Sequence, residues 1–216
     1  MHDILLNLFV LAVFAIIAVG ILLFVRNKQA EQKKEIERMA AERGWSYESL
    51  REPLSWGERI KGANWTLEAI STSSGRETGP GSSDVSMLTT WKADAPGSTL
   101  LIGKGSAQAS LGAMGDTLTQ QVLKMALGAD AYDLVEVEVG SPEFRSQYMV
   151  WAQEPAEAGK LVSPALQAAL LKWKGEPPVI KRTSQGLIIE VHGVHLKKPD
   201  ELIALIQIGE LLQAGY

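Results

Sequence analysis

Residues 4–25 have the sequence ILLNLFVLAVFAIIAVGILLFV, a run in which 20 of 22 residues are apolar and none is charged. A helix rises about 1.5 Å per residue, so the run is about 33 Å long, enough to cross a hydrocarbon core of roughly 30 Å. Leu, Ile, Val and Phe fill 17 of the positions, and moving that many such side chains into lipid is favourable by about 5–10 kcal/mol. Ile4–Val25 therefore predicts a transmembrane anchor over residues 1–25, with the lipid bilayer as its partner.

A cleaved signal peptide is the alternative interpretation of this run. Such a peptide combines a basic start, an apolar core of about 7–15 residues and a cleavage site of small residues. Here only Met1, His2 and Asp3 precede the run, the run is longer than such a core, and Arg26 follows it directly. We therefore expect the run to be kept as an anchor.

The charges around the run predict its orientation. No Lys or Arg precedes it, whereas four basic residues follow within nine positions, namely Arg26, Lys28, Lys33 and Lys34. Basic flanks stay on the cytoplasmic side of a membrane. We expect a single-pass protein with its N-terminus outside and its C-terminal part in the cytoplasm, and an exported body would be an exception to this rule.

Residues 26–43 predict a charged helical stalk that continues the membrane helix. They hold six basic and four acidic residues, and Gly44 is suited to end a helix because glycine tolerates a positive φ. The remaining residues, 44–216, form the expected body and carry 15 basic and 20 acidic residues. Anionic lipids should repel this body mildly, so the stalk is expected to hold it clear of the membrane. The basic cluster is expected to set topology rather than to bind headgroups.

The composition excludes several classes of function. The 216 residues include no cysteine, which excludes disulfides, thiolate catalysis, iron–sulfur clusters and cysteine zinc sites. The 21 basic residues are outnumbered by 25 acidic ones. A nucleic-acid partner is therefore not expected.

The body is expected to be an α+β domain, a mostly antiparallel sheet packed with about three helices. Alternation and β-formers predict strands at residues 65–70, 85–91, 99–102, 134–139, 148–151, 179–182 and 187–192. Helices are expected at residues 116–127, at residues 161–173 and from Pro199 onward. The glycine- and serine-rich residues 73–84 and 103–115 predict irregular backbone. Strands and helices do not alternate regularly, which favours α+β over α/β.

Several spaced motifs carry a resemblance to a known group of proteins. They follow the N-terminal run and the Arg43-Gly-Trp45 stalk end, and they are Ser141-Pro-Glu-Phe-Arg-Ser-Gln-Tyr-Met-Val-Trp151, Glu154-Pro-Ala-Glu-Ala158, the 161–173 helix and Gly186-Leu-Ile-Ile-Glu190. In this order they resemble a group of uncharacterised bacterial membrane-anchored proteins. The resemblance implies an N-terminal span in the bacterial inner (cell) membrane and a cytoplasmic domain of unassigned function, and it supplies no catalytic residues.

His192 and His195 are the only closely spaced histidines. Glu190 shares a strand face with His192, so a Glu/His/His metal site is one hypothesis. The spacing lacks the i,i+4 pattern that would place two imidazoles on one helical face. We favour two partly exposed polar side chains at a strand-to-helix corner, and no metal or cofactor is predicted.

Glu136 and Glu138 lie about 7 Å apart on one face of the strand predicted at residues 134–139. Two such carboxylates could act as an acid–base pair. Alternating carboxylates are more typical of the solvated face of a strand.

The glycine-rich segment Gly103-Lys-Gly-Ser106 invites comparison with a phosphate-binding loop. It fails the Walker pattern because position 98 is Ser rather than Gly and because Gly follows Lys104. An anion could still bind its backbone amides, but we favour a linker. Trp65 and Trp91 are likewise expected to pack in the core rather than to form a ligand groove.

These observations leave two functional hypotheses, and no catalytic residue is predicted with either. The first is a membrane-tethered binding or scaffold module with a protein partner or a second copy, the copies joining through the stalk or through strand edges. The second is a membrane-anchored enzyme, such as a hydrolase acting near the bilayer with Glu136, Glu138 or His192 in its site.

Overall fold

The computed structural model describes residues 2–77, 83–105, 127 and 133–215, and of residues 2–16, 22, 29, 76, 77, 83 and 84 it describes the backbone only. The helix predicted at residues 116–127 lies almost entirely outside the described residues. In chain order the elements are α1 (His2–Glu42), β1 (Ser46–Glu52), β2 (Ser55–Lys61), β3 (Trp65–Glu77), β4 (Ser83–Ala93), β5 (Leu100–Lys104), β6 (Val135–Glu136), α3 (Pro142–Gln147), β7 (Tyr148–Ala152), α4 (Pro155–Leu161), α5 (Pro164–Leu171), β8 (Val179–Thr183), β9 (Gly186–His192) and α6 (Pro199–Ala214).

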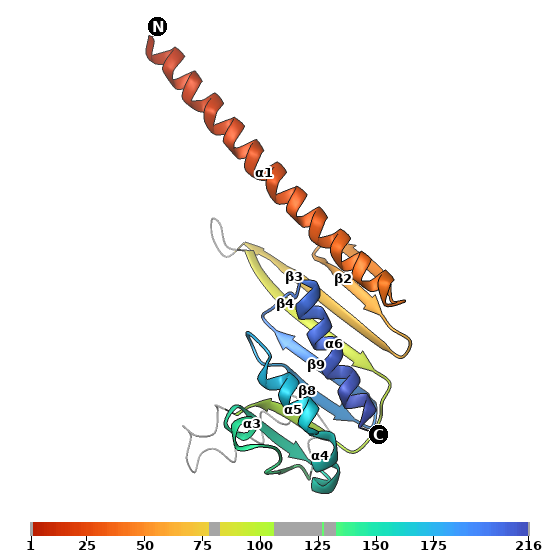
Figure 1. Ribbon diagram of the computed structural model, residues 1–216. Helices are drawn as coiled ribbons and strands as arrows, with labels where there is room; N and C mark the ends of the chain where they lie inside the picture. Colours follow the sequence, from red (N-terminus) through yellow and green to blue (C-terminus); the bar gives the residue numbers. More distant parts are fainter. Residues whose placement is uncertain (1, 78–82, 106–126, 128–132, 216) are drawn as a thin grey trace, which may run out of the picture.

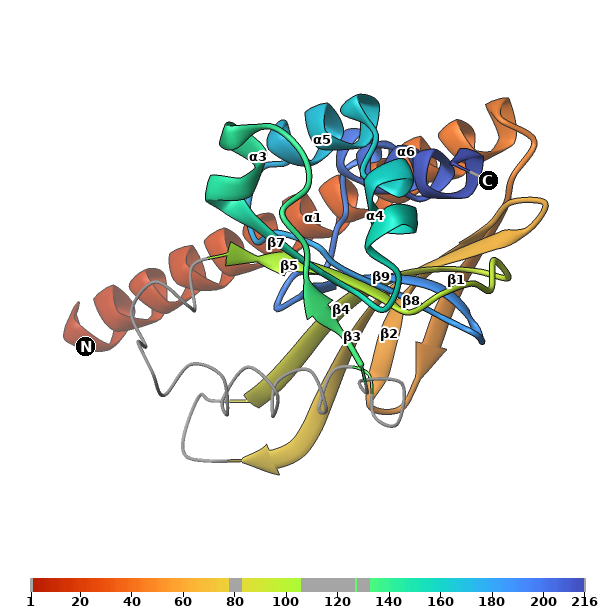
Figure 2. The same ribbon diagram turned by 90° about the horizontal axis from the view of Figure 1, so that it is seen from below.

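The strands form one twisted sheet in the order β1-β2-β3-β4-β9-β8-β5-β7-β6. Every pairing in it is antiparallel. Figure 2 shows that α3, α4, α5, α6 and the end of α1 lie on one face of this sheet. The predicted α+β class is therefore confirmed, with helices gathered on a single face of an antiparallel sheet.

The core lies between this face and the helices. Trp91 of β4 is fully buried and stacks on Trp65 of β3, with ring centroids 6.2 Å apart and planes 28° apart. Trp45 meets Trp65 edge-on at 5.0 Å. The expectation that Trp65 and Trp91 pack in the core is confirmed.

Helix α1 continues without a break from the apolar run through the predicted stalk. Its end belongs to the body, because Ile36, Met39 and Ala40 are buried in the core. The helix ends before Gly44, whose φ of +70° matches the expectation for that residue. Among the residues whose side chains the structure describes, which leave out residues 2–16, a helix with the length and apolar content of a membrane span is not found. The span over Ile4–Val25 stays a prediction.

The strand predictions succeed in the centre of the sheet and fail at its margins. The strands predicted at residues 65–70, 85–91, 179–182 and 187–192 are confirmed as β3, β4, β8 and β9, which pair as two hairpins. The expected loop at residues 73–84 was too wide, since β3 extends to Glu77 and β4 begins at Ser83. Of the irregular backbone expected at residues 103–115, the part at residues 103–104 is wrong because β5 continues to Lys104, and residues 106–115 lie outside the described residues. The strand expected at residues 134–139 is confined to Val135–Glu136.

Two further corrections concern helices and the first hairpin. The helix expected at residues 161–173 is α5, which is shorter because it begins at Pro164, after the Ser163 N-cap, whose hydroxyl accepts from the Leu166 amide at 3.3 Å. Helix α4 lies before it and was not predicted. The hairpin β1–β2 was not predicted. Its strands are rich in charged and polar residues, and β1 is an exposed edge strand, so they lack the apolar alternation that marks a half-buried strand.

A buried phenol in this fold predicts a loss of stability at alkaline pH. Tyr148 is 4% exposed, its hydroxyl donates to the Leu170 carbonyl at 3.1 Å, and burial raises its pKa to about 12. Because the phenol of the unfolded chain ionises near pH 10, this stabilisation is complete below about pH 10 and is lost as the pH rises to about 12. We expect the free energy of unfolding of Tyr148→Phe, measured by urea titration from about pH 9 to 12, to fall less steeply than that of the unsubstituted chain. Parallel curves would contradict this.

Candidate functional site

A chain of three polar side chains, two buried and one partly buried, joins distant parts of the sequence on the helix-covered face. The Ser71 hydroxyl lies 2.7 Å from His195 Nδ1, and His195 Nε2 lies 2.8 Å from a Glu58 carboxylate oxygen. Ser71 belongs to β3, Glu58 to β2, and His195 to the connection between β9 and α6. We call these three residues the polar triad.

The local backbone holds His195 in this position. Gly193 has a φ of +72° and its amide donates to the Met87 carbonyl at 2.9 Å, which turns the chain back over the sheet. The buried Thr89 hydroxyl donates to the Val194 carbonyl at 3.0 Å and accepts from the Leu196 amide at 3.2 Å. The residues on both sides of His195 are thereby fastened to β4.

The distances in the polar triad allow one arrangement of protons for a neutral imidazole ring. An ionised carboxylate only accepts hydrogen bonds, so Nε2 carries the ring proton and donates it to Glu58. Nδ1 then accepts from the Ser71 hydroxyl. The three groups are those of a serine hydrolase, in which the imidazole takes the proton of the nucleophile, but the two ring nitrogens are exchanged: there Nε2 faces the serine and Nδ1 the acid. Ser71 is only 3% exposed, so a substrate would reach it only after its neighbours move apart.

Loss of the imidazole should destabilise the fold. His195→Ala leaves a buried hydroxyl and a partly buried carboxylate without this partner, which typically costs about 1–3 kcal/mol. His192→Ala is the matched control, because the His192 side chain is 60% exposed and its loss should change the free energy of unfolding by no more than about 0.5 kcal/mol. Urea denaturation of the two variants measures the difference, and equal effects would show that the triad carries no stabilisation.

The structure separates the residues of the hypothetical Glu/His/His metal site. His192 Nε2 lies 3.1 Å from Glu190, which also pairs with Lys181 at 2.8 Å on the solvent face of the sheet. His195 points to the opposite face, and the expectation that it is partly exposed is wrong. Within the described residues no three or more His, Asp or Glu side chains gather in a way that could hold a metal ion.

The structure also separates the residues of the hypothetical hydrolase site. Glu136 lies on the edge strand β6, and three strands stand between β6 and the β9 strand of His192. The Glu138 side chain is 83% exposed and pairs with Arg145 at 2.9 Å. Glu136, Glu138 and His192 therefore share no site. Sequence reasoning missed Ser71 and Glu58, because they lie 124 and 137 positions from His195 and no local motif links them.

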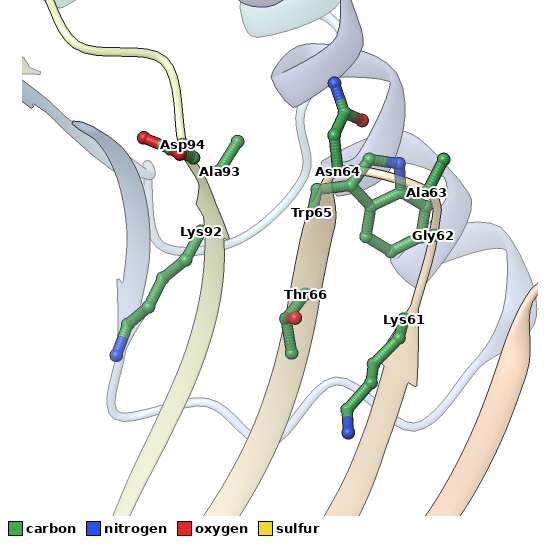
Figure 3. Close-up of a pocket in the computed structure, with 9 residues that line it drawn as sticks. All are labelled: Lys61, Gly62, Ala63, Asn64, Trp65, Thr66, Lys92, Ala93 and Asp94. Atoms are coloured by element: carbon green, nitrogen blue, oxygen red, sulfur yellow. The ribbon is translucent and has the colours of Figure 1, made fainter.

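A shallow pocket opens at the β2–β3 turn, at one end of the sheet (Figure 3). It has a volume of about 350 Å³. In the strand register Lys61 and Lys92 stand on either side of Thr66, and Asn64 and Asp94 complete the polar lining. Arg59 and Lys181 on the same sheet face are ion-paired, whereas Lys61 and Lys92 form no ion pair with any described residue. The pocket therefore presents two lysines that an acidic group could neutralise.

Comparison with known proteins assigns no relative. No family model, no curated protein and no solved structure matches the chain.

Proposed function

We propose that the chain is a membrane-tethered binding or scaffold module, held in the bacterial inner (cell) membrane by Ile4–Val25 with its body in the cytoplasm. The tether is supported by the uncharged apolar run and by the exposure of its described side chains, among which Ile17 is 51% and Phe24 68% exposed. Apolar side chains exposed along a helix need a partner outside the chain. A lipid bilayer matches an apolar run of this length.

The main support for the scaffold role is that the body packs directly against the end of helix α1. Ile36, Met39 and Ala40 of α1 are buried in the core, so the helix that leaves the body is part of its packing. A flexible linker would let the body turn freely. A helix packed in this way presents the sheet and its pocket at a fixed orientation, which suits a module that recruits another protein.

The pocket of Figure 3 is the proposed contact with that partner. Lys61 and Lys92 lack an ion pair among the described residues, and an acidic side chain or phosphate group on a partner would supply one. Because Asp94 at the rim offsets one of the two lysines, the pocket has a net charge of +1. This charge favours a single acidic group over a polyanion.

Crosslinking in native membranes tests the binding role. We compare the unsubstituted chain with Lys61→Ala/Lys92→Ala and with the charge-matched control Lys172→Ala/Lys174→Ala, whose positions are exposed. The pocket variant should lose crosslinked partners that the control keeps. Recovery of no crosslinked protein with any of the three chains would overturn the binding role, and equal recovery with all three would remove the pocket from it.

A reporter fused after Tyr216 tests the orientation. Alkaline phosphatase is active only outside the cytoplasm, whereas green fluorescent protein folds in it. Basic residues after the run predict fluorescence without phosphatase activity, and the reverse would place the body outside.

A second candidate function is a membrane-anchored hydrolase, favoured by the polar triad. In such a reaction Ser71 Oγ would attack an acyl carbonyl while its proton passes to His195 Nδ1. The imidazole would return that proton to the leaving group, and water would then release the acyl chain. A fluorophosphonate probe, which labels activated serines, tests this role: the unsubstituted chain and Ser73→Ala should be labelled and Ser71→Ala should not. An unlabelled full-length chain in lipid vesicles would remove the hydrolase candidate.

A further inference from the structure

Three large apolar side chains remain exposed at the end of the sheet opposite the pocket. Leu54, Trp56 and Met87 are 53%, 41% and 39% exposed. Trp56 and Met87 stand on either side of Ser71 in the strand register, so they lie on the helix-covered face, at a place that the helices leave open. Leu54 lies at the same end of the sheet, because its carbonyl accepts a hydrogen bond from the Ser73 amide at 2.8 Å. We call these three residues the apolar edge.

Measured along the chain, the apolar edge and the end of the apolar run of α1 are about equally far from the Trp45–Trp65 contact. Trp45, just after α1, touches Trp65 at the start of β3, so the two elements leave from a common level. Both views show them running in the same general direction from there (Figures 1 and 2). From Glu42 back to Val25 the helix covers about 26 Å. From Trp65 the strand covers about 20 Å to Ser71, beside Trp56, and about 26 Å to Ser73, beside Leu54.

These lengths place the edge within a headgroup layer. The polar region on each side of a bilayer is roughly 5–7 Å thick. If Val25 marks the end of the hydrocarbon core, Leu54 lies about at that boundary and Trp56 about 6 Å outside it. The expectation that a stalk holds the body clear of the lipid stays a prediction, and the docking competes with it because β3 and β4 run in the same general direction as the helix.

The chemistry of the edge suits that layer. Tryptophan is enriched where membranes meet water because its ring is apolar and its N–H polar. Arg51 stands opposite Trp56 in the register and Glu52 follows it, so the fixed charges beside the edge cancel. Contact with lipid would depend on apolar insertion and would not require anionic headgroups.

We propose that Leu54, Trp56 and Met87 dock into the headgroup layer of the same bilayer that holds α1. Two contacts with the membrane, the helix and the apolar edge, then fix the tilt of the sheet and turn the Lys61/Lys92 pocket toward the cytoplasm. The proposal rests on the proposed anchor, and the experiment below separates the two.

Single-cysteine labelling tests the docking, and the chain has no cysteine of its own. We attach the environment-sensitive dye NBD to Leu54→Cys and to Met87→Cys in the full-length chain. The matched control is Val135→Cys, which is 50% exposed on the strand at the other edge of the sheet. Leu23→Cys reports on the anchor. Each chain is reconstituted in phosphatidylcholine vesicles with and without headgroup-attached or acyl-attached spin labels, and circular dichroism confirms folding.

The expected result is a blue-shifted dye at positions 54 and 87 that headgroup spin labels quench severalfold more than the dye at position 135. Leu23→Cys should be quenched by acyl-attached labels. If position 23 is quenched while positions 54 and 87 behave like position 135, the docking is overturned and the anchor stands. If position 23 is not quenched, the anchor itself is overturned. A blue shift at positions 54 and 87 without lipid quenching would mean that protein, such as a second copy, covers the edge instead.

Discussion

Trp91→Ala is expected to lower the free energy of unfolding by about 3–5 kcal/mol, the range found when a buried aromatic ring is removed. Trp91 is fully buried and stacks on Trp65. Helix α6 crosses its ring at Gly209, where an added Cβ would lie 2.4 Å from a ring carbon. Because the ring fills the space between sheet and helix, its loss leaves a cavity that neither element can close. Urea denaturation of the full-length chain in a non-ionic detergent, followed by circular dichroism, measures the loss.

Two further variants control this prediction. Trp91→Phe should cost clearly less, since the buried indole N–H has no hydrogen-bond partner in the described residues and the substitution breaks no such bond. Trp56→Ala removes the same side chain from an exposed position and should lie within about 0.5 kcal/mol of the unsubstituted chain in detergent. A loss at Trp56 as large as that at Trp91 would contradict the assignment of the core.

The second large effect concerns attachment to the membrane. We expect the full-length chain to stay with membranes after washing with alkaline carbonate, which removes peripheral proteins. A chain that begins at Arg26 should appear in the wash, because it lacks the run whose transfer into lipid is favourable by about 5–10 kcal/mol. Sedimentation followed by immunoblotting gives the two fractions.

A lysine substitution sharpens this test without shortening the chain. One lysine at the centre of a span costs about 2.5–3.5 kcal/mol, so Val13→Lys/Ala15→Lys should release a large share of the protein, whereas Val13→Leu/Ala15→Leu should release none. Release of the unsubstituted chain by carbonate would contradict the anchor. The apolar edge alone is too small to resist this wash.

Much of the fold could be predicted from local sequence because local chemistry dominates there. The strands predicted at residues 179–182 and 187–192 pair across Gly186, whose φ is +137°. Pro199 begins a helix where predicted. The first hairpin could not be predicted, since the Arg59 side chain of β2 is held by Glu48 of β1 and by Glu68 of β3 at 3.1 and 2.6 Å. Strands joined by ion pairs carry charged side chains at positions where an apolar alternation would otherwise appear, so the sequence shows no strand periodicity there.

The residues of the candidate sites were less predictable than the fold. His195 was noticed because of its neighbour His192, yet the two side chains lie on opposite faces of the sheet. The lysines of the pocket, Lys61 and Lys92, come together through the register of three strands. Neither grouping has a sequence signal, because a contact between distant segments depends on how the strands are ordered.

The amino-acid sequence was sufficient for the features that depend on composition and short-range periodicity: the apolar run, the continuation of its helix to Gly44, the central hairpins and the α+β class. The other features of the fold and of the candidate sites depend on tertiary packing. It placed Ile36, Met39 and Ala40 in the core, joined Ser71 to His195 and Glu58, and left Leu54, Trp56 and Met87 exposed at one end of the sheet. The reason is physical, since short-range patterns determine which local structure a segment adopts, whereas burial and hydrogen bonding between segments depend on their arrangement in space.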